Sequence, residues 1–313
     1  MRKKTAFTLW LALAAVGCSG SATPTQPTSP SSLATIPGWS VLNAQSRGNS
    51  DAAHLCAQSG YLTVVRADGS GFTTVGECVS YAAQGGTFGG GPVCTGAPAG
   101  IISWWPGEGN ALDIVGHYDG TPLAGATFGT GLVGQAFSLD GIDDDIVVNN
   151  NAALNPPSIT VEAWIKPNSV AGIADVVTKW GFDATIDSWF LGVVNHGGVV
   201  QVLSGIGDGA TGDPGVFGGT VTLNVWSHVA MTYDAATGVN RVFVNGVSVN
   251  QRVRGNGIYA TTSRVFIGRE DSNNNRFFNG LIDEPTIYNR ALSDAEILAI
   301  YNAGSNGKCG TSS

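Results

Sequence analysis

The carboxyl-terminal two thirds of this chain consists of short strand-like segments separated by turns. The clearest is a hairpin in which residues 241–244 and 247–249 flank Asn245-Gly246, a pair that accepts the positive φ angles of a two-residue hairpin turn. With 45 glycines and 13 prolines, tight turns are frequent. Many short strands predict an all-β fold, a two-sheet antiparallel jelly-roll sandwich. Alternating apolar and polar residues predict a strand at 159–166. Further strands are expected at 225–233, 264–268 and 281–288.

One segment near the C-terminus is typical of a helix. Ser293 can cap its start, Glu296 completes a capping box three residues later, and Gly304 can end it. Residues 297–300 supply its apolar face. We therefore expect one short C-terminal helix beside the strands.

The N-terminus predicts export. Arg2, Lys3 and Lys4 precede an apolar run at 6–16 that is too short to span a bilayer and ends in Gly17-Cys18. Residues 1–17 are therefore a predicted signal peptide, and the ending resembles a bacterial lipobox in which Cys18 becomes lipidated. The protein would then be a lipoprotein of the cell envelope or surface, touching the membrane only through its lipid. Ordinary secretion is the alternative.

Two segments separate the N-terminus from the strand-rich region. Residues 18–37 carry four prolines and no charge, which predicts an extended tether. Residues 38–92 form a small cysteine-containing segment that ends in a glycine-rich stretch, 85–92, interpreted as a linker. The remaining residues, 93–313, form the large domain.

The cysteines divide in the same way. With Cys18 set aside, an even number remains, which favours disulfides in an exported protein. Three pairings are possible. We favour Cys56–Cys78 as a staple of the small segment and Cys94–Cys309 across the large domain, because the second pair brackets all the regular patterning.

The charge balance restricts the partners. The chain carries 15 Lys and Arg against 23 Asp and Glu, a formal net charge of −8. A nucleic-acid binder needs a basic surface, so nucleic acid is not an expected partner.

Several sequence blocks follow one another in the order typical of a known family. They are residues 101–110, Asp113, 134–141, 161–165, 226–230, 243–246, 279–284 and 288–293. Together they resemble the laminin-G-like, concanavalin A-like jelly-roll domains of bacterial surface proteins, over about residues 100–309. The resemblance implies a lectin, a glycan-binding module, an adhesion domain or a glycosidase.

Catalytic motifs of this fold are missing from the sequence. Glycosidases of the fold resemble one another in a strand with Glu-x-Asp-x-Glu spacing, and the acidic runs at 143–145 and 283–284 do not alternate in that way. His228 lies in a family block, where a hydrogen-bonded core histidine is the expectation. We therefore expect a non-catalytic module. A divergent glycosidase is a third hypothesis.

The oxygen-rich loops predict two calcium sites. The first joins Glu108, Asn110 and Asp113 to Asp283, because the N- and C-terminal strands of such sandwiches lie side by side. This calcium would be structural. A solvated polar loop is the alternative.

The second predicted site follows a strand. Glu270 and Asp271 are similar to the calcium-binding stretch of pentraxins, although Ser272 stands where pentraxins have a further acidic residue. Asn273 and Asn274 follow as candidate ligand contacts. Here too a solvated loop is the alternative.

Exposed aromatic rings would complete a glycan site, because sugars stack their C–H faces on them. Trp180, Trp189 and Tyr259 lie in glycine- and aspartate-rich segments outside the family blocks and are the candidates. Calcium-assisted glycan binding at the cell surface is the leading hypothesis, and a protein–protein adhesion or scaffold domain is the alternative.

The last strand carries a departure from the family. Pro285 follows Asp283-Glu284, and proline cannot donate to a sheet. The strand at 281–288 is therefore expected to lie at a sheet edge there, or to bulge.

Overall fold

The structure is a computed structural model. It describes residues 64–66, 74–84, 88–90, 94–181, 187–210, 213, 215–255, 257–271 and 276–309. The chain divides into two units, residues 1–41 and 42–313. The first unit, which contains Cys18, lies outside the described residues. Among the helices of the described ranges, none is long and apolar enough to cross a membrane.

The described part of the small N-terminal segment is a strand pair with one helix. β1 (Val64–Arg66) pairs antiparallel with β2 (Phe88–Gly90), and α2 (Val75–Ala83) lies between them in sequence. β2 falls inside the glycine-rich stretch interpreted as a linker, so that interpretation is wrong for these residues, because glycine backbone can join a ladder. Cys78 on α2 is buried and disulfide-bonded, and its expected partner Cys56 lies outside the described residues.

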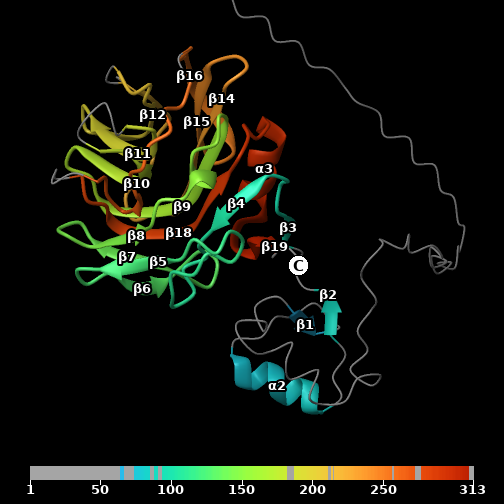
Figure 1. The fold of residues 1–313 in the computed structure, drawn as a ribbon. Helices are drawn as coiled ribbons and strands as arrows, with labels where there is room; N and C mark the ends of the chain where they lie inside the picture. The colour runs from blue at the N-terminus through green and yellow to red at the C-terminus, as the bar shows by residue number, and fades with distance from the viewer. Residues whose placement is uncertain are drawn as a thin grey trace, which may run out of the picture. The chain divides into compact units, whose positions relative to one another are not determined.

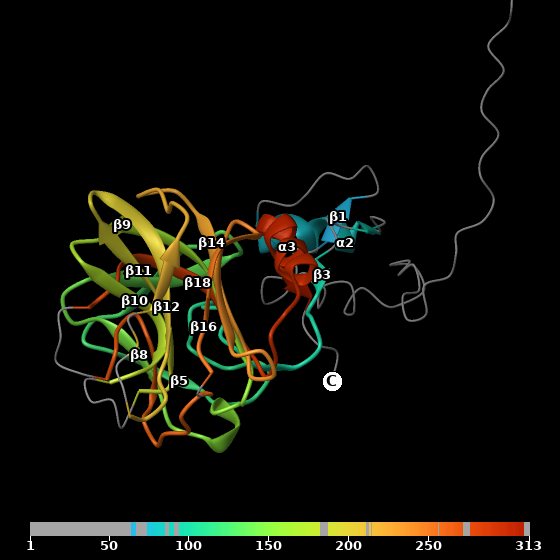
Figure 2. The same cartoon turned by 90° about the horizontal axis from the view of Figure 1, so that it is seen from above.

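The large domain is a sandwich of two antiparallel sheets (Figures 1 and 2), as the strand pattern predicted. One sheet has seven strands and the other has eight. In spatial order the seven-stranded sheet contains β13 (Val216–Gly218), β12 (Val199–Ile206), β11 (Trp189–His196), β10 (Ile173–Lys179), β17 (Val265–Ile267), β8 (Asp145–Val148) and β5 (Gly120–Leu123). The eight-stranded sheet contains β16 (Val247–Val253), β15 (Val239–Val244), β14 (Ser227–Asp234), β9 (Ile159–Ser169), β18 (Asn279–Tyr288), β7 (Gln135–Asp140) and β6 (Thr127–Thr130), with β4 (Ile101–Trp104) also paired to β18.

Alternation along the strands decides what enters the core. On β9, Ile159, Val161 and Ile165 face the other sheet and join its apolar residues in one cluster. Glu162 and Trp164 therefore point to the outer face of the eight-stranded sheet. Both faces of β9 are buried, because further elements cover the outer one.

The helix α3 (Asp294–Ala303) covers part of that outer face (Figure 2). Its capping box is present: Ser293 accepts from the backbone N–H of Glu296, and the Glu296 side chain accepts from the backbone N–H of Ser293. Gly304 ends the helix and begins a short 3-10 turn, Gly304–Asn306. The capping box and the helix end at Gly304 were predicted, and the 3-10 turn was not. A second 3-10 turn, Ala152–Leu154, lies before β9.

The strand β18 bulges where Pro285 interrupts it. Its pairing with β9 shifts register between Asp283 and Thr286, and Glu284 adopts a left-handed backbone with φ of 59°. The bulge was one of the two expected outcomes. The edge position was the other and is wrong, since β18 has β9 on one side and β7 and β4 on the other.

The two ends of the large domain meet. β3 (Thr95–Gly96) and β19 (Lys308–Cys309) pair in parallel, and Cys94 and Cys309 form the predicted disulfide. The bridge closes a loop with a sequence separation of 215. In the chain-entropy account, a loop of this length stabilises the fold by about 5 kcal/mol.

Candidate functional site

Two of the three aromatic side chains predicted to contact a ligand are packed inside the protein. Trp189 is 0 % exposed in the core, and its indole N–H donates to the carbonyl of Leu154 at 3.2 Å. Trp180 is 6 % exposed and packs edge-on against Phe190, with 4.9 Å between ring centroids. Only Tyr259, 40 % exposed, offers a ring face. The prediction is wrong for Trp180 and Trp189, because polar neighbours in sequence do not place an aromatic ring at the surface.

These residues nevertheless belong to one rim of the seven-stranded sheet. The backbone N–H of Asp271 donates to the carbonyl of Trp180 at 2.9 Å, and that of Tyr259 donates to the carbonyl of Gly207 at 2.9 Å. Gly207 in turn donates to Ser188, next to Trp189. Asn273 and Asn274 fall outside the described residues.

Asp113, from the first predicted calcium site, is an anchor for its own loop. Its carboxylate accepts backbone N–H groups from Trp104, Val115, Gly116 and Tyr118 at 2.9 to 3.2 Å. A carboxylate that accepts four N–H donors has little lone-pair capacity left for a cation. Asn110 is likewise engaged locally, since its side-chain oxygen accepts the N–H of Leu112.

Glu108 and Asp283 both bind the turn at residues 131–135. Glu108 accepts the N–H of Gln135, and Asp283 accepts those of Leu132 and Val133 at 2.7 and 2.9 Å. Burial, with a contribution from Glu284, raises the pKa of Asp283 to about 8. The first predicted set is therefore divided between two anchoring roles and is not assembled as one ligand set.

The second predicted calcium pair is neutralised by arginines. Glu270, buried, lies 3.0 Å from Arg276, and Asp271 lies 3.0 Å from Arg264. An arginine at this distance already compensates the carboxylate and competes with a cation for it. Each of the two carboxylates is thus paired with an arginine on the outer face of the seven-stranded sheet.

The same face holds a buried carboxyl group that the sequence did not single out. Asp175 on β10 is 0 % exposed, and neither of its side-chain oxygens has a hydrogen-bond partner among the described residues. Burial raises its pKa to about 8, with Arg276 opposing the shift and Glu270 adding to it. The β10–β11 pairing shifts register directly after Asp175, so the backbone is irregular at this residue.

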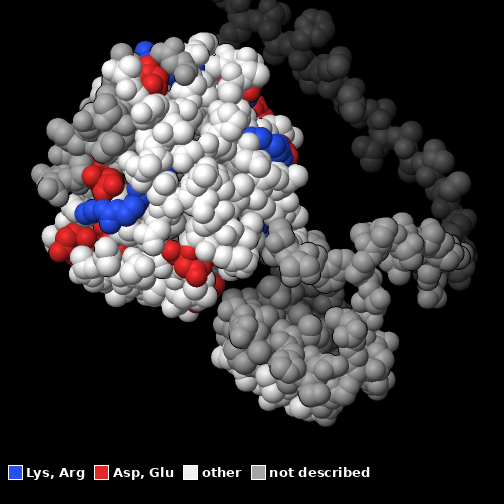
Figure 3. Space-filling view, viewed as in Figure 1, with Lys and Arg blue, Asp and Glu red and all other residues white. Residues whose placement is uncertain are grey.

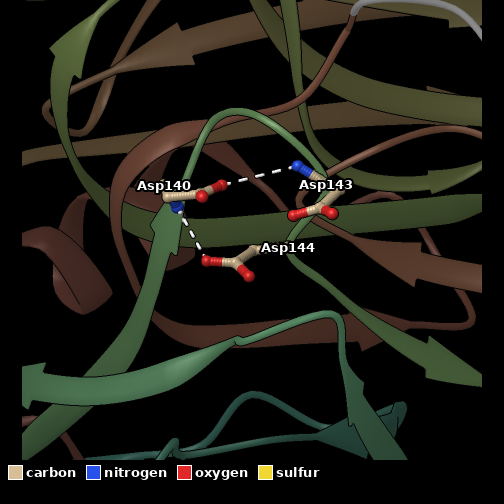
Figure 4. A group of neighbouring side chains, drawn as sticks. All are labelled: Asp140, Asp143 and Asp144. Atoms are coloured by element: carbon tan, nitrogen blue, oxygen red, sulfur yellow. Dashed lines mark hydrogen bonds between the residues drawn. The ribbon is translucent and has the colours of Figure 1, made fainter.

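Three carboxylates converge on the loop between β7 and β8 (Figure 4). Side-chain oxygens of Asp140, Asp143 and Asp144 lie within 4.8 Å of one another, the one such group of three among the described residues. Asp140 accepts the N–H groups of Ile142 and Asp143, which folds the loop. In the sequence, Asp143 and Asp144 form an acidic run with Asp145. In the structure, Asp145 begins β8 and pairs with Arg269 at 2.6 Å.

A pocket of about 380 Å³ lies beside this loop. Gly141 and Ile142 contribute one wall, and the β9–β10 turn contributes another. Asn279 at the start of β18 closes it, fixed by a 2.7 Å hydrogen bond to the Asp140 carbonyl. The lining residues are Gly141, Ile142, Ser169, Val170, Ala171, Gly172, Ile173, Ala174, Phe277 and Asn279.

The charged side chains of the domain lie in small mixed groups. On the face drawn in Figure 3, blue and red residues lie next to one another within a largely uncharged surface. The ion pairs of the domain include Arg264–Asp271 and Arg269–Asp145. This face has no broad basic patch of the kind that binds nucleic acid.

The comparisons with known proteins agree on the fold. The family model described as the concanavalin A-like lectin/glucanases superfamily, of laminin G type, matches residues 140–298. No curated protein matches the sequence.

Solved structures with TM-scores above 0.5 share this architecture at low sequence identity, and a pentraxin is a weaker match. Domain 4 of an extracellular arabinanase from Geobacillus stearothermophilus, solved in complex with arabinotriose, is 20 % identical, with a TM-score of 0.51 over 63 % of this chain and 96 % of that one. The binding domain of Paraclostridial Mosquitocidal Protein 1 is 17 % identical, with a TM-score of 0.53 over 65 % of this chain and about half, 52 %, of that one. A pentraxin from Limulus polyphemus is 18 % identical, with a TM-score of 0.40 over 49 % of this chain and 72 % of that one.

Replacing Asp175 should change how stability depends on pH. Because the folded pKa of Asp175 is raised to about 8 from 3.8, the folded state holds a proton that the unfolded state releases. Stability is therefore lost as pH rises through this window. Asp175→Asn should reduce the fall in unfolding free energy between about pH 5 and about pH 9, measured by urea denaturation.

The matched control is Asp143→Asn, which changes an exposed aspartate. It should leave that fall as it is in the unmodified protein. An Asp175→Asn profile identical to that of the control would contradict the assignment.

Proposed function

Because the chain belongs to the concanavalin A-like lectin/glucanase superfamily, we propose that it is a non-catalytic recognition module that binds carbohydrate in the pocket beside the β9–β10 turn. The observation that carries this proposal is the composition of the pocket. Phe277 and Ile142 present apolar surface, while Asn279 and Ser169 present hydrogen-bonding groups. A sugar needs both, since its ring has apolar C–H faces and a rim of hydroxyl groups.

The β9–β10 turn leaves free space at Gly172, one of the residues that line the pocket. A Cβ atom added at Gly172 would meet no atom within 4 Å. Asn279 is held in place from two sides, by the Asp140 carbonyl and by Asn168 at 3.0 Å. A preformed polar group loses little entropy on binding, which favours ligand recognition.

The likeness to the arabinanase domain supports a sugar ligand. That domain was solved with arabinotriose, and nearly all of it aligns with this chain. The toxin binding domain supports a recognition role in the same way.

A non-catalytic role is supported by the burial of the carboxyl groups on the outer face of the seven-stranded sheet. A glycosidase needs two carboxyl groups in contact with the glycosidic bond. Asp175 and Glu270 are at most 1 % exposed, so a polysaccharide does not reach them.

The second candidate function is adhesion to a protein through the same surface. Ile142 at the mouth of the pocket is 71 % exposed. An exposed aliphatic side chain at a loop tip suits a protein partner as well as a sugar.

Filling the pocket should abolish glycan binding. Gly172→Leu adds a side chain into open space at a pocket residue and should reduce binding on a glycan array that includes arabinotriose by at least about tenfold. The bound oligosaccharides should be recovered uncleaved. Gly255→Leu is the matched control, because a Cβ there also meets no atom within 4 Å and Gly255 does not line the pocket.

Equal glycan binding by both variants would contradict the pocket assignment. Absence of glycan binding by the unmodified protein, with capture of a protein ligand that Gly172→Leu abolishes, would favour adhesion.

We propose that calcium supports this site at Asp140, Asp143 and Asp144, whose loop also lines the pocket. Calcium at 100 times its dissociation constant should stabilise the folded protein by about 2.7 kcal/mol relative to chelator, seen as a higher melting midpoint. Asp143→Asn should remove most of the shift. Asp234→Asn, which changes a half-buried aspartate at the end of β14 outside the acidic group, should not. An identical midpoint with calcium and with chelator would exclude this part of the proposal while leaving the pocket intact.

We propose that Cys18 anchors the protein in a bacterial membrane. The full chain expressed in a bacterium should incorporate labelled fatty acid and sediment with membranes, whereas Cys18→Ser should do neither. Cys94→Ser is the control, since it removes a cysteine of the domain disulfide and leaves the anchor. Recovery of the unmodified chain in the soluble exported fraction would instead indicate ordinary secretion.

A further inference from the structure

A group of ionisable side chains is buried on the outer face of the eight-stranded sheet, away from the pocket. Lys308 on β19 lies with its Nζ 3.0 Å from Glu162 Oε1 on β9 and 3.2 Å from Glu284 Oε2 on β18. His228 on β14 lies 3.1 Å from the other oxygen of Glu162. All four side chains are 3 % exposed or less.

Aromatic rings surround this group. The Lys308 Nζ lies 5.0 Å from the centroid of the Trp104 ring, and Trp164 packs edge-on against His228 at 5.2 Å. Tyr288 is fully buried in the adjoining apolar cluster. Water is thus kept away from the lysine and the two carboxyl groups, which strengthens their mutual interaction and favours loss of water from a reacting pair.

The backbone of Glu284 is held in an unfavourable conformation. Its φ of 59° is in the left-handed region, which few residues other than glycine adopt, and Pro285 follows it in the bulge of β18. Such a conformation persists only where the surroundings impose it, and it often marks a functional position. Here it places a second buried glutamate against Lys308.

We propose that Lys308 and Glu284 form an intramolecular amide bond. The Glu162 carboxylate takes a proton from the Lys308 ammonium group, and the neutral Nζ attacks the Cδ carbon of the protonated Glu284. The Nζ–Cδ bond forms and the bond from Cδ to the hydroxyl oxygen breaks. Of the two protons that Nζ loses, one leaves with the hydroxyl as water and the other stays on Glu162. No oxidant or activating group is required.

The protonation states of the two glutamates suit these roles. Burial raises the pKa of Glu284 to about 7, so its carboxyl group is substantially protonated near neutral pH. Burial alone would also raise the pKa of Glu162, but Lys308 and the hydrogen bond with His228 lower it overall. Burial alone would lower the pKa of Lys308, but the two glutamates raise it overall. Transfer of its proton to Glu162 across the 3.0 Å contact is therefore the uphill step of the reaction.

Peptide mapping of the full chain tests the bond without any variant. After denaturation, reduction and alkylation, trypsin should not cleave after an acylated Lys308. Residues 277–290 and 291–313 should then be recovered as one branched peptide, lighter than their sum by one water, with fragment ions that place the link between Glu284 and Lys308.

Two variants test the roles of Lys308 and Glu162 in forming the bond. Lys308→Arg keeps the positive charge but should give unlinked peptides. Glu162→Gln removes the base and should leave most of the chain unlinked. Recovery of residues 277–290 as a free peptide from the unmodified folded protein, with cleavage after Lys308, would overturn the proposal. A link from Lys308 to Glu162 would overturn the choice of Glu284 as acceptor.

Discussion

Ion pairs between buried side chains connect the C-terminal end of the large domain to its central strands. Glu162 lies in the middle of β9, fully buried, where an unpaired carboxylate would strongly destabilise the fold. Its partners His228 and Lys308 come from a neighbouring strand and from β19, the last strand of the domain. The central sheet is therefore electrostatically complete only when the C-terminal end has docked.

The burial of both sheet faces explains which of the predicted ligand-contact residues reach the surface. Both faces of the main strands are covered, one by the opposite sheet and the other by α3 or by loops. Trp180 and Phe190, on the outer face of the seven-stranded sheet, are therefore buried as deeply as many core residues. Open surface for recognition remains at the ends of the strands, and the pocket beside the β9–β10 turn lies at one such end.

Features set by neighbours in sequence could be predicted. The Asn245-Gly246 hairpin, the capping box at Ser293 and the bulge at Pro285 each depend on a few adjacent residues. The candidate pocket could not be predicted in this way, because it is assembled from segments far apart in sequence: the β7–β8 loop, the β9–β10 turn and the start of β18. The acidic group beside it is local, but the sequence run pointed to Asp145, which lies on β8 and pairs with Arg269.

Few features of the sequence indicate the buried cluster of Glu162, His228, Glu284 and Lys308. Glu162 takes a polar position of an alternating strand, as a surface residue would, and nothing near Lys308 in sequence distinguishes it from a surface lysine. Only Pro285, directly after Glu284, marks an irregular strand. The contacts of Glu162 lie far along the chain, since this residue is on β9, 66 residues before His228 and further still from Lys308.

The junction of β3 and β19 also has a mechanical consequence. Because Cys94 and Cys309 are covalently joined, tension applied to the chain at these two points passes through the sulfur–sulfur bond and does not peel strands from either sheet. A pull on the domain from its N-terminal side against a ligand held at the β9–β10 turn would instead load the sandwich along a path that contains the hydrogen bonds of β9 and β18. The disulfide therefore fixes the two ends of the domain to each other, and a load applied elsewhere is carried by the hydrogen bonds of the sheets.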